Sequence, residues 1–244
     1  SRMDRFALVK GGSFNLAKAL AERFKSFGGE IIEGAHVSEI THKNGMVTGI
    51  HLEGGDSIEA RQAVVSTVDP PQTLRMVGDD GFGSRLSEKV RNFKPSPHAI
   101  CTIHLALNEP PQYTAATFEP DINRAFNTLF GVADEGQLAE NFEATARGEF
   151  PPVPMGNGAC NTLFDPSYAP PGKHTAFWWP FVPYDLKDGG PEAWDTKREE
   201  FTDRLLEVWR SYAPNLGGKN VLGTYLFTPL DTERSCINMI RGSH

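Results

Sequence analysis

The sequence has few cysteines and no long apolar run. Three cysteines, Cys101, Cys160 and Cys236, are spread over 244 residues, so their number and spacing indicate neither a disulfide framework nor a zinc site. We therefore expect the cytoplasm or another reducing compartment, with Cys101 and Cys160 buried as small apolar side chains. Nothing approaches the roughly 20 apolar residues that a membrane-spanning helix needs. The first residues also lack the charged, apolar and small-residue series of a signal peptide.

Clusters of basic residues and metal-binding motifs are absent as well. The formal net charge is −7, which argues against nucleic acid, because phosphates select for clustered Lys and Arg. No H-x-H or H-E-x-x-H occurs, so no metal site is predicted. His98 and His104 share one face of a predicted strand but lie about 20 Å apart along it. Each is expected to be a surface histidine or a core histidine with its hydrogen bonds satisfied.

The composition is that of an ordinary globular protein, with 39% hydrophobic and 23% charged residues. The length allows one or two domains. Asp69-Pro70-Pro71 interrupts the pattern, so we place a boundary between residues 1–70 and residues 71–244. Helical and strand patterns alternate in both parts. The predicted fold class is therefore α/β, or mixed α+β.

The first part begins with a glycine pair, Gly11-Gly12, followed by a helix. Its apolar residues recur at helical spacing and form a face suited to lie close to a sheet: Leu16, Leu20, Phe24 and Phe27. Gly28-Gly29 ends the helix, and residues 30–33 are expected to form a short strand. The glycine pair precedes free helix amides that could bind phosphate, although such pairs are common without that role.

From His36 onward the apolar residues alternate with period two. Asn44-Gly45 and Gly54-Gly55 are hairpin-turn dipeptides, which predicts a three-stranded meander with exposed turns. A return strand would follow and end at Ser66-Thr67. The residues expected to be buried are Val37, Ile40, Val64 and Val65.

The second part is predicted to form a mixed β-sheet covered by helices. A strand over 99–107 has one apolar face, and its other face carries both His98 and His104. The longest helix, over 194–212, has an apolar stripe that would cover one side of the sheet. The remaining predicted elements are strands at 127–132, 159–164, 174–182 and 221–227 and a helix over 134–147.

The aromatic run from Phe177 to Phe181 places large rings on both faces of one strand. Two interpretations remain open for these rings. They are core residues, or one face lines an apolar ligand cavity, because aromatic area is costly to leave in water. Near the end of the chain, Asp231 and Arg234 are placed to form an ion pair.

The order of these motifs resembles the FAD-dependent phytoene desaturase and amine oxidase superfamily. The motifs are Gly11-Gly12, Leu16 to Leu20, Gly28 to Ile31, Val37 to Ile40, Gly45 to Gly49, and Ala60 to Ser66. The region from Gly172 to Arg234 is similar to the branch that includes pyridine nucleotide-disulphide oxidoreductase domain-containing proteins. The resemblance implies that residues 1–70 are part of an FAD-binding domain and that residues 71–244 are a substrate-binding domain.

The resemblance also assigns roles to residues, none of them catalytic. It implies that FAD is contacted by Gly11, Gly12, Val37, Ser66 and Thr67. It implies that an apolar substrate, of the isoprenoid class, is contacted by Phe177, Trp179 and Phe181. In such proteins the flavin accepts hydride while the protein supplies a dry apolar cavity. The resemblance also implies that the motif from Thr228 to Arg234 lies near the mouth of the substrate cavity. Without the family, Val37 is simply a core residue and Asp231 belongs to a structural ion pair with Arg234.

Two family segments are missing from this sequence. No G-x-G-x-x-G occurs, although that motif admits the FAD pyrophosphate to a helix N-terminus. The closing glycine-rich flavin segment is absent too. We therefore expect an internal fragment that retains no FAD by itself and is inactive alone. The alternatives are a noncatalytic α/β module that binds an apolar ligand or a partner protein, and amine oxidation. Membrane-surface contact is not indicated, and the oligomeric state stays open.

Overall fold

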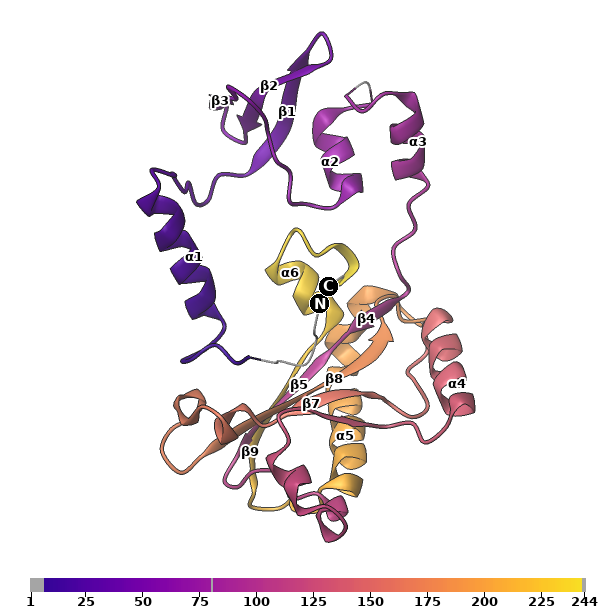
Figure 1. Ribbon diagram of the computed structural model, residues 1–244. Coiled ribbons are helices and arrows are strands. Elements are labelled where there is room, and N and C mark those ends of the chain that lie inside the picture. The colour runs from indigo at the N-terminus through magenta and orange to yellow at the C-terminus, as the bar shows by residue number, and fades with distance from the viewer. Residues whose placement is uncertain (1–6, 80, 243–244) are drawn as a thin grey trace. The chain divides into compact units, whose positions relative to one another are not determined.

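A computed structural model of the chain describes residues 7–79 and 81–242, which form two compact units (Figure 1). The larger unit consists of the residues up to Leu20 and those from Ser96 onward, and the smaller unit spans Ala21–Pro95. The first helix, α1 (Phe14–Ser26), belongs partly to each. This division by compactness differs from the boundary that Asp69-Pro70-Pro71 indicates at residue 70, which stays a prediction.

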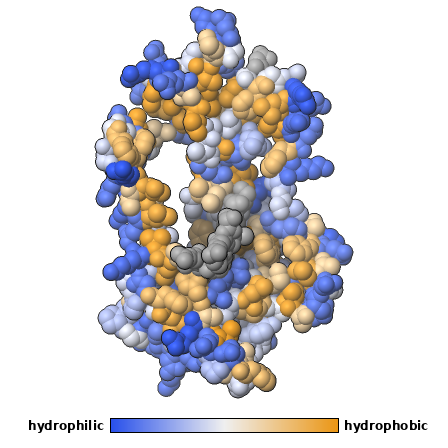
Figure 2. Space-filling view, in the orientation of Figure 1, coloured by the Kyte–Doolittle hydropathy of each residue, from blue (hydrophilic) through white to orange (hydrophobic). Residues whose placement is uncertain are grey.

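The helix α1 forms where the sequence predicts it and ends before Gly28, whose φ of 84° suits glycine. Its apolar face, however, is not buried against a sheet in the part of the chain that the structure describes. Figure 2 shows this face as an apolar stripe at the surface. Its exposed members are Phe14, Leu16, Leu20, Phe24 and Phe27.

The smaller unit contains the predicted meander. Its antiparallel strands are β1 (Val37–Lys43), β2 (Met46–Leu52) and β3 (Ser57–Glu59). Asn44 and Gly45 both have positive φ, as a two-residue hairpin turn requires, and both glycine turns are exposed as predicted. The helix α2 (Pro70–Val77) packs on β1 and contacts α3 (Ser84–Arg91). Ile40, Leu74 and Val77 are buried in this small core.

Two strands predicted in this region do not form, and three of the four burial predictions are not met. Residues 30–33 and 60–68 have no strand structure. Beyond the hydrogen bond from the Ala60 amide to the Thr48 carbonyl, the described residues offer the second segment no neighbouring strand. Val65 is consequently 84% exposed. Val37 and Val64 are half-buried instead of buried, whereas Ile40 is buried as predicted.

The larger unit is built on one sheet with strand order β6-β7-β8-β5-β9, in which β4 also pairs with β8. The chain combines helices with antiparallel sheets, so it has the mixed α and β content that the sequence predicts. All strand pairs among the described residues are antiparallel, so the sheet is not of mixed direction. The strands are β4 (His98–Ile100), β5 (Thr102–Leu107), β6 (Thr128–Phe130), β7 (Gly156–Ala159), β8 (His174–Pro183) and β9 (Val221–Phe227).

The prediction of a strand over 159–164 is wrong. The strand β7 ends at Ala159, and Asn161–Leu163 form a 3₁₀ turn. The Thr162 hydroxyl lies 3.4 Å from the Cys160 sulfur and 2.9 Å from the His174 ring. The contact with His174 holds this turn against the first residue of β8. The thiol of Cys160 is buried within this turn, and burial raises its pKa.

The longest helix, α5 (Trp194–Tyr212), covers one face of the sheet over the predicted residues (Figure 1). Its stripe of Trp194, Phe201, Leu205 and Trp209 is fully buried. The sheet meets it with Trp178, whose ring centroid lies 4.6 Å from that of Phe130 and 6.1 Å from that of Trp209. The predicted burial of Cys101 and Cys160 is confirmed, and all three cysteines are free thiols.

An ion-pair clamp fastens α5 to β9 and to α6 (Pro229–Ser235). The Arg198 guanidinium binds both carboxylate oxygens of Asp231, at 2.6 and 2.9 Å, and donates to the Leu226 carbonyl. Asp231 also completes a capping box with Thr228. The predicted Asp231–Arg234 pair is therefore wrong: the cap turns Asp231 back to Thr228 and Arg198, and Arg234 pairs with Asp195 instead.

Candidate functional site

The sheet face opposite to α5 is the candidate ligand site. Along β8 the side chains of Ala176, Trp178, Pro180 and Val182 are buried, because they meet α5 and the core. The alternate residues point the other way, as strand geometry requires. Phe177 is half-buried, whereas Trp179 and Phe181 are 43% and 38% exposed. The sequence therefore placed the three predicted substrate residues on one face, and that face is partly open in the described residues.

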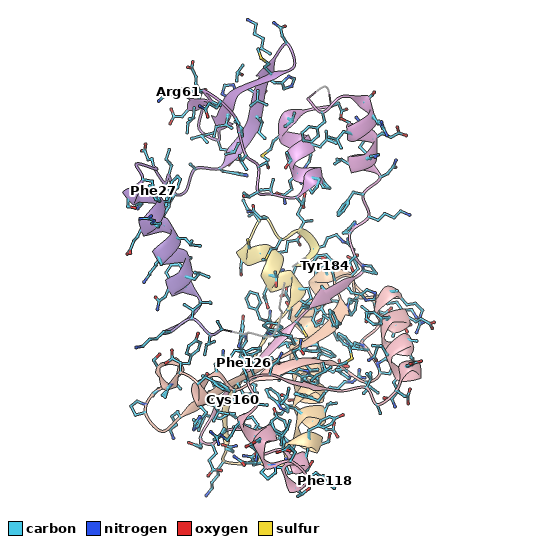
Figure 3. The ribbon with its side chains drawn as sticks, in the orientation of Figure 1. Phe27, Arg61, Phe118, Phe126, Cys160 and Tyr184 are labelled. Atoms are coloured by element: carbon cyan, nitrogen blue, oxygen red, sulfur yellow. The ribbon has the colours of Figure 1, made fainter. Side chains whose placement is uncertain are left out.

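The rings of Phe177 and Trp179 stack on this face, with centroids 5.1 Å apart and an interplanar angle of 26°. The exposed ring of Tyr225 lies on β9, where its centroid is 6.5 Å from that of Phe227. On the opposite edge, exposed Leu129 of β6 pairs with Asn157 of β7, which in turn pairs with Trp179. Aromatic and apolar side chains thus cross the open face from β6 to β9. Phe118 is no part of it and lies at the tip of the connection after β5 (Figure 3).

The helix α4 (Glu135–Ala146) closes one end of this face. Asp134 caps the helix and accepts a hydrogen bond from the Gln137 amide at 2.9 Å. Phe142 of α4 lies 6.2 Å from Phe181 and meets the His98 ring edge-on at 4.9 Å, measured between centroids. These contacts leave Phe177 and Trp179, nearer the middle of β8, without a covering helix among the described residues.

The two histidines of this face differ in environment. His98 lies under Phe142, and its Nδ1 is buried without a hydrogen-bond partner in the described residues. The expectation of a satisfied core histidine is therefore wrong for His98, and burial lowers the pKa of its imidazole. His104 is exposed at the middle of β5, as expected of a surface histidine. Partial removal of water still lowers its pKa.

His104 is a residue of this face that the sequence did not single out as functional. It stands directly opposite Phe177 on β8 and Tyr225 on β9. Period-two alternation placed it opposite to the core, but it could not tell which strands would flank β5. The strand neighbours that give His104 an aromatic setting are more than 70 residues away in sequence.

The predicted cofactor residues Gly11 and Gly12 form a turn held by the larger unit. The Gly11 amide donates to Asp165 Oδ2 at 2.7 Å, and the Gly12 amide donates to the Val9 carbonyl at 3.1 Å. Hydrogen bonds from Ser167 and from the Gly11 amide hold the pKa of Asp165 below its ordinary value. The carboxylate of Asp165 already occupies the position in which a phosphate would meet Gly11.

The other predicted cofactor residues belong to the smaller unit. Val37 opens β1 opposite Leu52. The Ser66 hydroxyl hydrogen-bonds to the Thr73 hydroxyl at 2.7 Å, beside the turn into α2, and Thr67 is exposed. The five cofactor assignments therefore stay predictions from the family resemblance.

Other kinds of site find no support in the residues that the structure describes. No group of three or more His, Cys, Asp or Glu side chains is arranged to hold a metal ion. No helix over residues 7–79 and 81–242 is long and apolar enough to cross a membrane. The open aromatic face of the larger unit remains the strongest candidate.

Comparison with curated proteins finds oxidoreductases that match nearly the whole chain. A limonene dehydrogenase subunit from Castellaniella defragrans is 27% identical over 100% of this chain and 46% of its own length. The mouse pyridine nucleotide-disulfide oxidoreductase domain-containing protein 2 is 23% identical over 94% of this chain and 40% of its own. The lycopene-forming phytoene desaturase of Pantoea ananas is 25% identical over 96% and 44%. The chain thus spans less than half the length of these relatives.

Solved structures agree on the fold. An oxidoreductase from Methanosarcina mazei superposes on 89% of this chain and 42% of its own, with a TM-score of 0.56 and 20% identity. A protein from Pyrococcus furiosus superposes on 90% and 43%, with a TM-score of 0.54 and 15% identity. Models of known protein families gave no match. The resemblance that the motifs indicated is confirmed at low identity: the proteins that match this chain include a limonene dehydrogenase subunit, a pyridine nucleotide-disulfide oxidoreductase domain-containing protein and a phytoene desaturase.

Proposed function

We propose that this chain supplies the substrate-binding part of an FAD-dependent oxidoreductase that acts on an apolar small molecule of the isoprenoid class. Residues 71–244 would form the substrate domain, and residues 1–70 would form part of the FAD domain. The observation that carries the proposal is the open face of β8, where Phe177, Trp179 and Phe181 present stacked aromatic area beside Tyr225. The names of two relatives, a limonene dehydrogenase subunit and a phytoene desaturase, support the substrate class.

In this proposal the chain binds and orients substrate and excludes water, while the flavin carries the redox chemistry. Flat rings suit that task, because an apolar molecule laid on them removes aromatic and ligand surface from water together. The sequence has no G-x-G-x-x-G motif, so FAD binding would depend on residues outside this chain. The chain by itself should be colourless and inactive.

The second candidate is a noncatalytic module whose open face holds an apolar ligand or a partner protein. The exposure of Trp179 and Leu129 on the same face favours this alternative equally. The two candidates differ in what the full-length protein does. If the chain is part of an oxidoreductase, the full-length protein should show a flavin absorbance band and should oxidise an apolar alkene. A noncatalytic module should do neither.

Binding to the isolated chain tests what both candidates share. A fluorescent fatty-acyl probe should bind to the chain, and Trp179→Leu should weaken its binding about ten-fold, since a stacked ring is worth about 1.4 kcal/mol. A chain that binds no such probe would refute the proposed site. Absorbance after gel filtration tests the cofactor separately: near-stoichiometric flavin in the isolated chain would contradict the assignment of FAD to outside residues.

The compartment and the partners are part of the same proposal. Three free thiols, two of them buried, suit a reducing compartment such as the cytoplasm. The acidic net charge argues against a nucleic-acid partner. The partner that we expect is an apolar small molecule, and direct binding measurements with such molecules test this expectation.

A further inference from the structure

One imidazole, that of His104, lies among the aromatic side chains at the centre of the open sheet face. His104 lies on β5, the strand between β8 and β9, and pairs with Phe177 on one side and Tyr225 on the other. Side chains directly opposite each other across strands have Cβ atoms about 5 Å apart. A ligand laid across the Phe177–Trp179 stack toward β9 therefore passes over His104.

The imidazole of His104 is available to such a ligand. Within residues 7–79 and 81–242 its ring nitrogens have no hydrogen-bond or ion-pair partner, in contrast to His174, whose Nδ1 is bound by Thr162. A neutral imidazole offers one donor and one acceptor. A pure hydrocarbon that covers this ring would strip its water and return no hydrogen bond, which is unfavourable.

We propose that His104 selects ligands at this site, binding the hydroxyl or carbonyl oxygen of an otherwise apolar molecule in preference to a hydrocarbon of the same shape. The inference rests on the proposed function, because it requires the open face to be the ligand site. It adds a substrate class to that function: an isoprenoid or similar molecule that carries one neutral oxygen.

The charge state of His104 sharpens the choice of ligand. Partial desolvation lowers the pKa of the imidazole, and no neighbouring charge contributes to that shift. The titratable group facing it is Tyr225 of β9, whose ring lies 5.6 Å from the Arg198 guanidinium. On β8 the facing residues are Phe177 and, one pair along, Thr175. The lowered pKa favours the neutral imidazole, which suits a neutral oxygen better than a carboxylate.

Three matched isoprenoids test the inference: farnesol, farnesene and farnesoic acid share a carbon skeleton and differ in the oxygen group. Displacement of the bound fatty-acyl probe from the isolated chain gives their relative affinities. We expect farnesol to bind about ten-fold tighter than farnesene, the usual worth of one hydrogen bond in a desolvated site. Farnesoic acid should gain on farnesol as the pH is lowered, because a protonated imidazole attracts a carboxylate.

The variants assign the preference to one side chain. His104→Leu should abolish the preference, with farnesol bound more weakly and farnesene more tightly than by the wild type. His104→Asn should show part of the wild-type preference. Thr102→Val is the matched control, because it removes a polar group from the same face of the same strand and should leave the preference unchanged. Circular dichroism melting curves verify that each variant is folded, which the exposure of His104 favours.

The outcomes separate the inference from the proposed function. If the probe does not bind to the wild-type chain, the site itself is refuted, and the inference falls with it. If the probe binds but farnesol and farnesene compete equally, or if Thr102→Val and His104→Leu have the same effect, His104 is not the selecting residue while the site stands.

Discussion

The two faces of β8 show how similar residues acquire different roles. Trp178 and Trp179 are neighbours in the sequence, yet Trp178 is 0% exposed under α5 and Trp179 is 43% exposed. The buried face is closed by a helix whose whole apolar stripe meets it, and that burial stabilises the unit. The open face keeps stacked rings at the surface, where they contribute less to stability. Exposed aromatic area retained on a rigid sheet is typical of a binding surface.

The largest expected effect lies on the closed face. Trp178→Ala should lower the free energy of unfolding by about 3–5 kcal/mol, because the void beside Phe130 and Trp209 cannot collapse fully. Urea denaturation of the purified chain measures it. Trp178→Phe is the matched control: the Trp178 indole N–H is buried without a partner in the described residues, so its loss removes an unsatisfied donor. Equal losses for Phe and Ala would contradict the packing account.

The clamp that holds α5 over the closed face comes next. Asp231→Asn should cost about 1–3 kcal/mol, since it weakens a charge-assisted pair and a capping box together. Burial of Asp231 opposes its charge, but hydrogen bonds from Arg198 and Thr228 prevail and hold its pKa below the ordinary value. A carboxyl whose folded pKa is depressed contributes stability above its unfolded pKa of about 3.9 and loses it as pH falls through the folded pKa.

The pH dependence supplies the measurement for the clamp. Denaturation midpoints of the wild-type chain and of Asp231→Asn should converge as the pH is lowered below about 4. Asp203→Asn, on the exposed side of α5, is the control and should behave like the wild type. A constant difference between wild type and Asp231→Asn down to pH 2 would show that the charge of Asp231 is not what stabilises the clamp.

The open face should respond in the opposite sense to the closed one. Trp179→Leu is expected to cost less than about 1.5 kcal/mol of stability, because much of the ring is already in water, while binding of an apolar probe falls about ten-fold. Probe titrations and denaturation curves on the same variant give both numbers. A stability loss as large as that of Trp178→Ala would make both faces core, and the comparison would fail.

The smallest effect is expected in the smaller unit. Val65→Asp should change stability by less than about 0.5 kcal/mol, as is usual for exposed positions. Ile40→Asp is the contrasting variant, because Ile40 is buried on β1 and an unpaired carboxylate there is costly. Thermal melts of both variants decide the matter. If Val65→Asp unfolds the chain, the side chain of Val65 must be buried, as the sequence pattern predicted.

Local signals predicted the elements that carry strong periodicity. The helix α5, the strand β9 and the meander turns form where spacing and glycines place them. Weak signals failed: residues 159–164 leave the strand after Ala159 and form a 3₁₀ turn, and residues 60–68 have no strand partner among the described residues beyond the Ala60–Thr48 hydrogen bond. The alternation of β8 predicted which aromatic residues share a face. It did not indicate which face a helix would cover.

Two helices with the same kind of pattern illustrate what the sequence alone cannot decide. Both α1 and α5 have apolar residues at helical spacing, but α5 buries its stripe and α1 exposes Phe24 and Phe27. Periodicity specifies that a helix has an apolar face, whereas burial depends on which distant segment packs against that face. The neighbours of a strand are likewise set by long-range pairing.

The sequence by itself therefore determined the helices α1, α4 and α5, the meander, the resemblance to oxidoreductases and the shared face of Phe177, Trp179 and Phe181. The tertiary structure alone decided that this face stays open, that His104 stands between Phe177 and Tyr225, and that Asp231 pairs with Arg198. The physical reason is one of range. Backbone propensity and side-chain period act over a few residues, but contacts across the sheet join segments more than 70 residues apart, and only packing of the whole unit selects them.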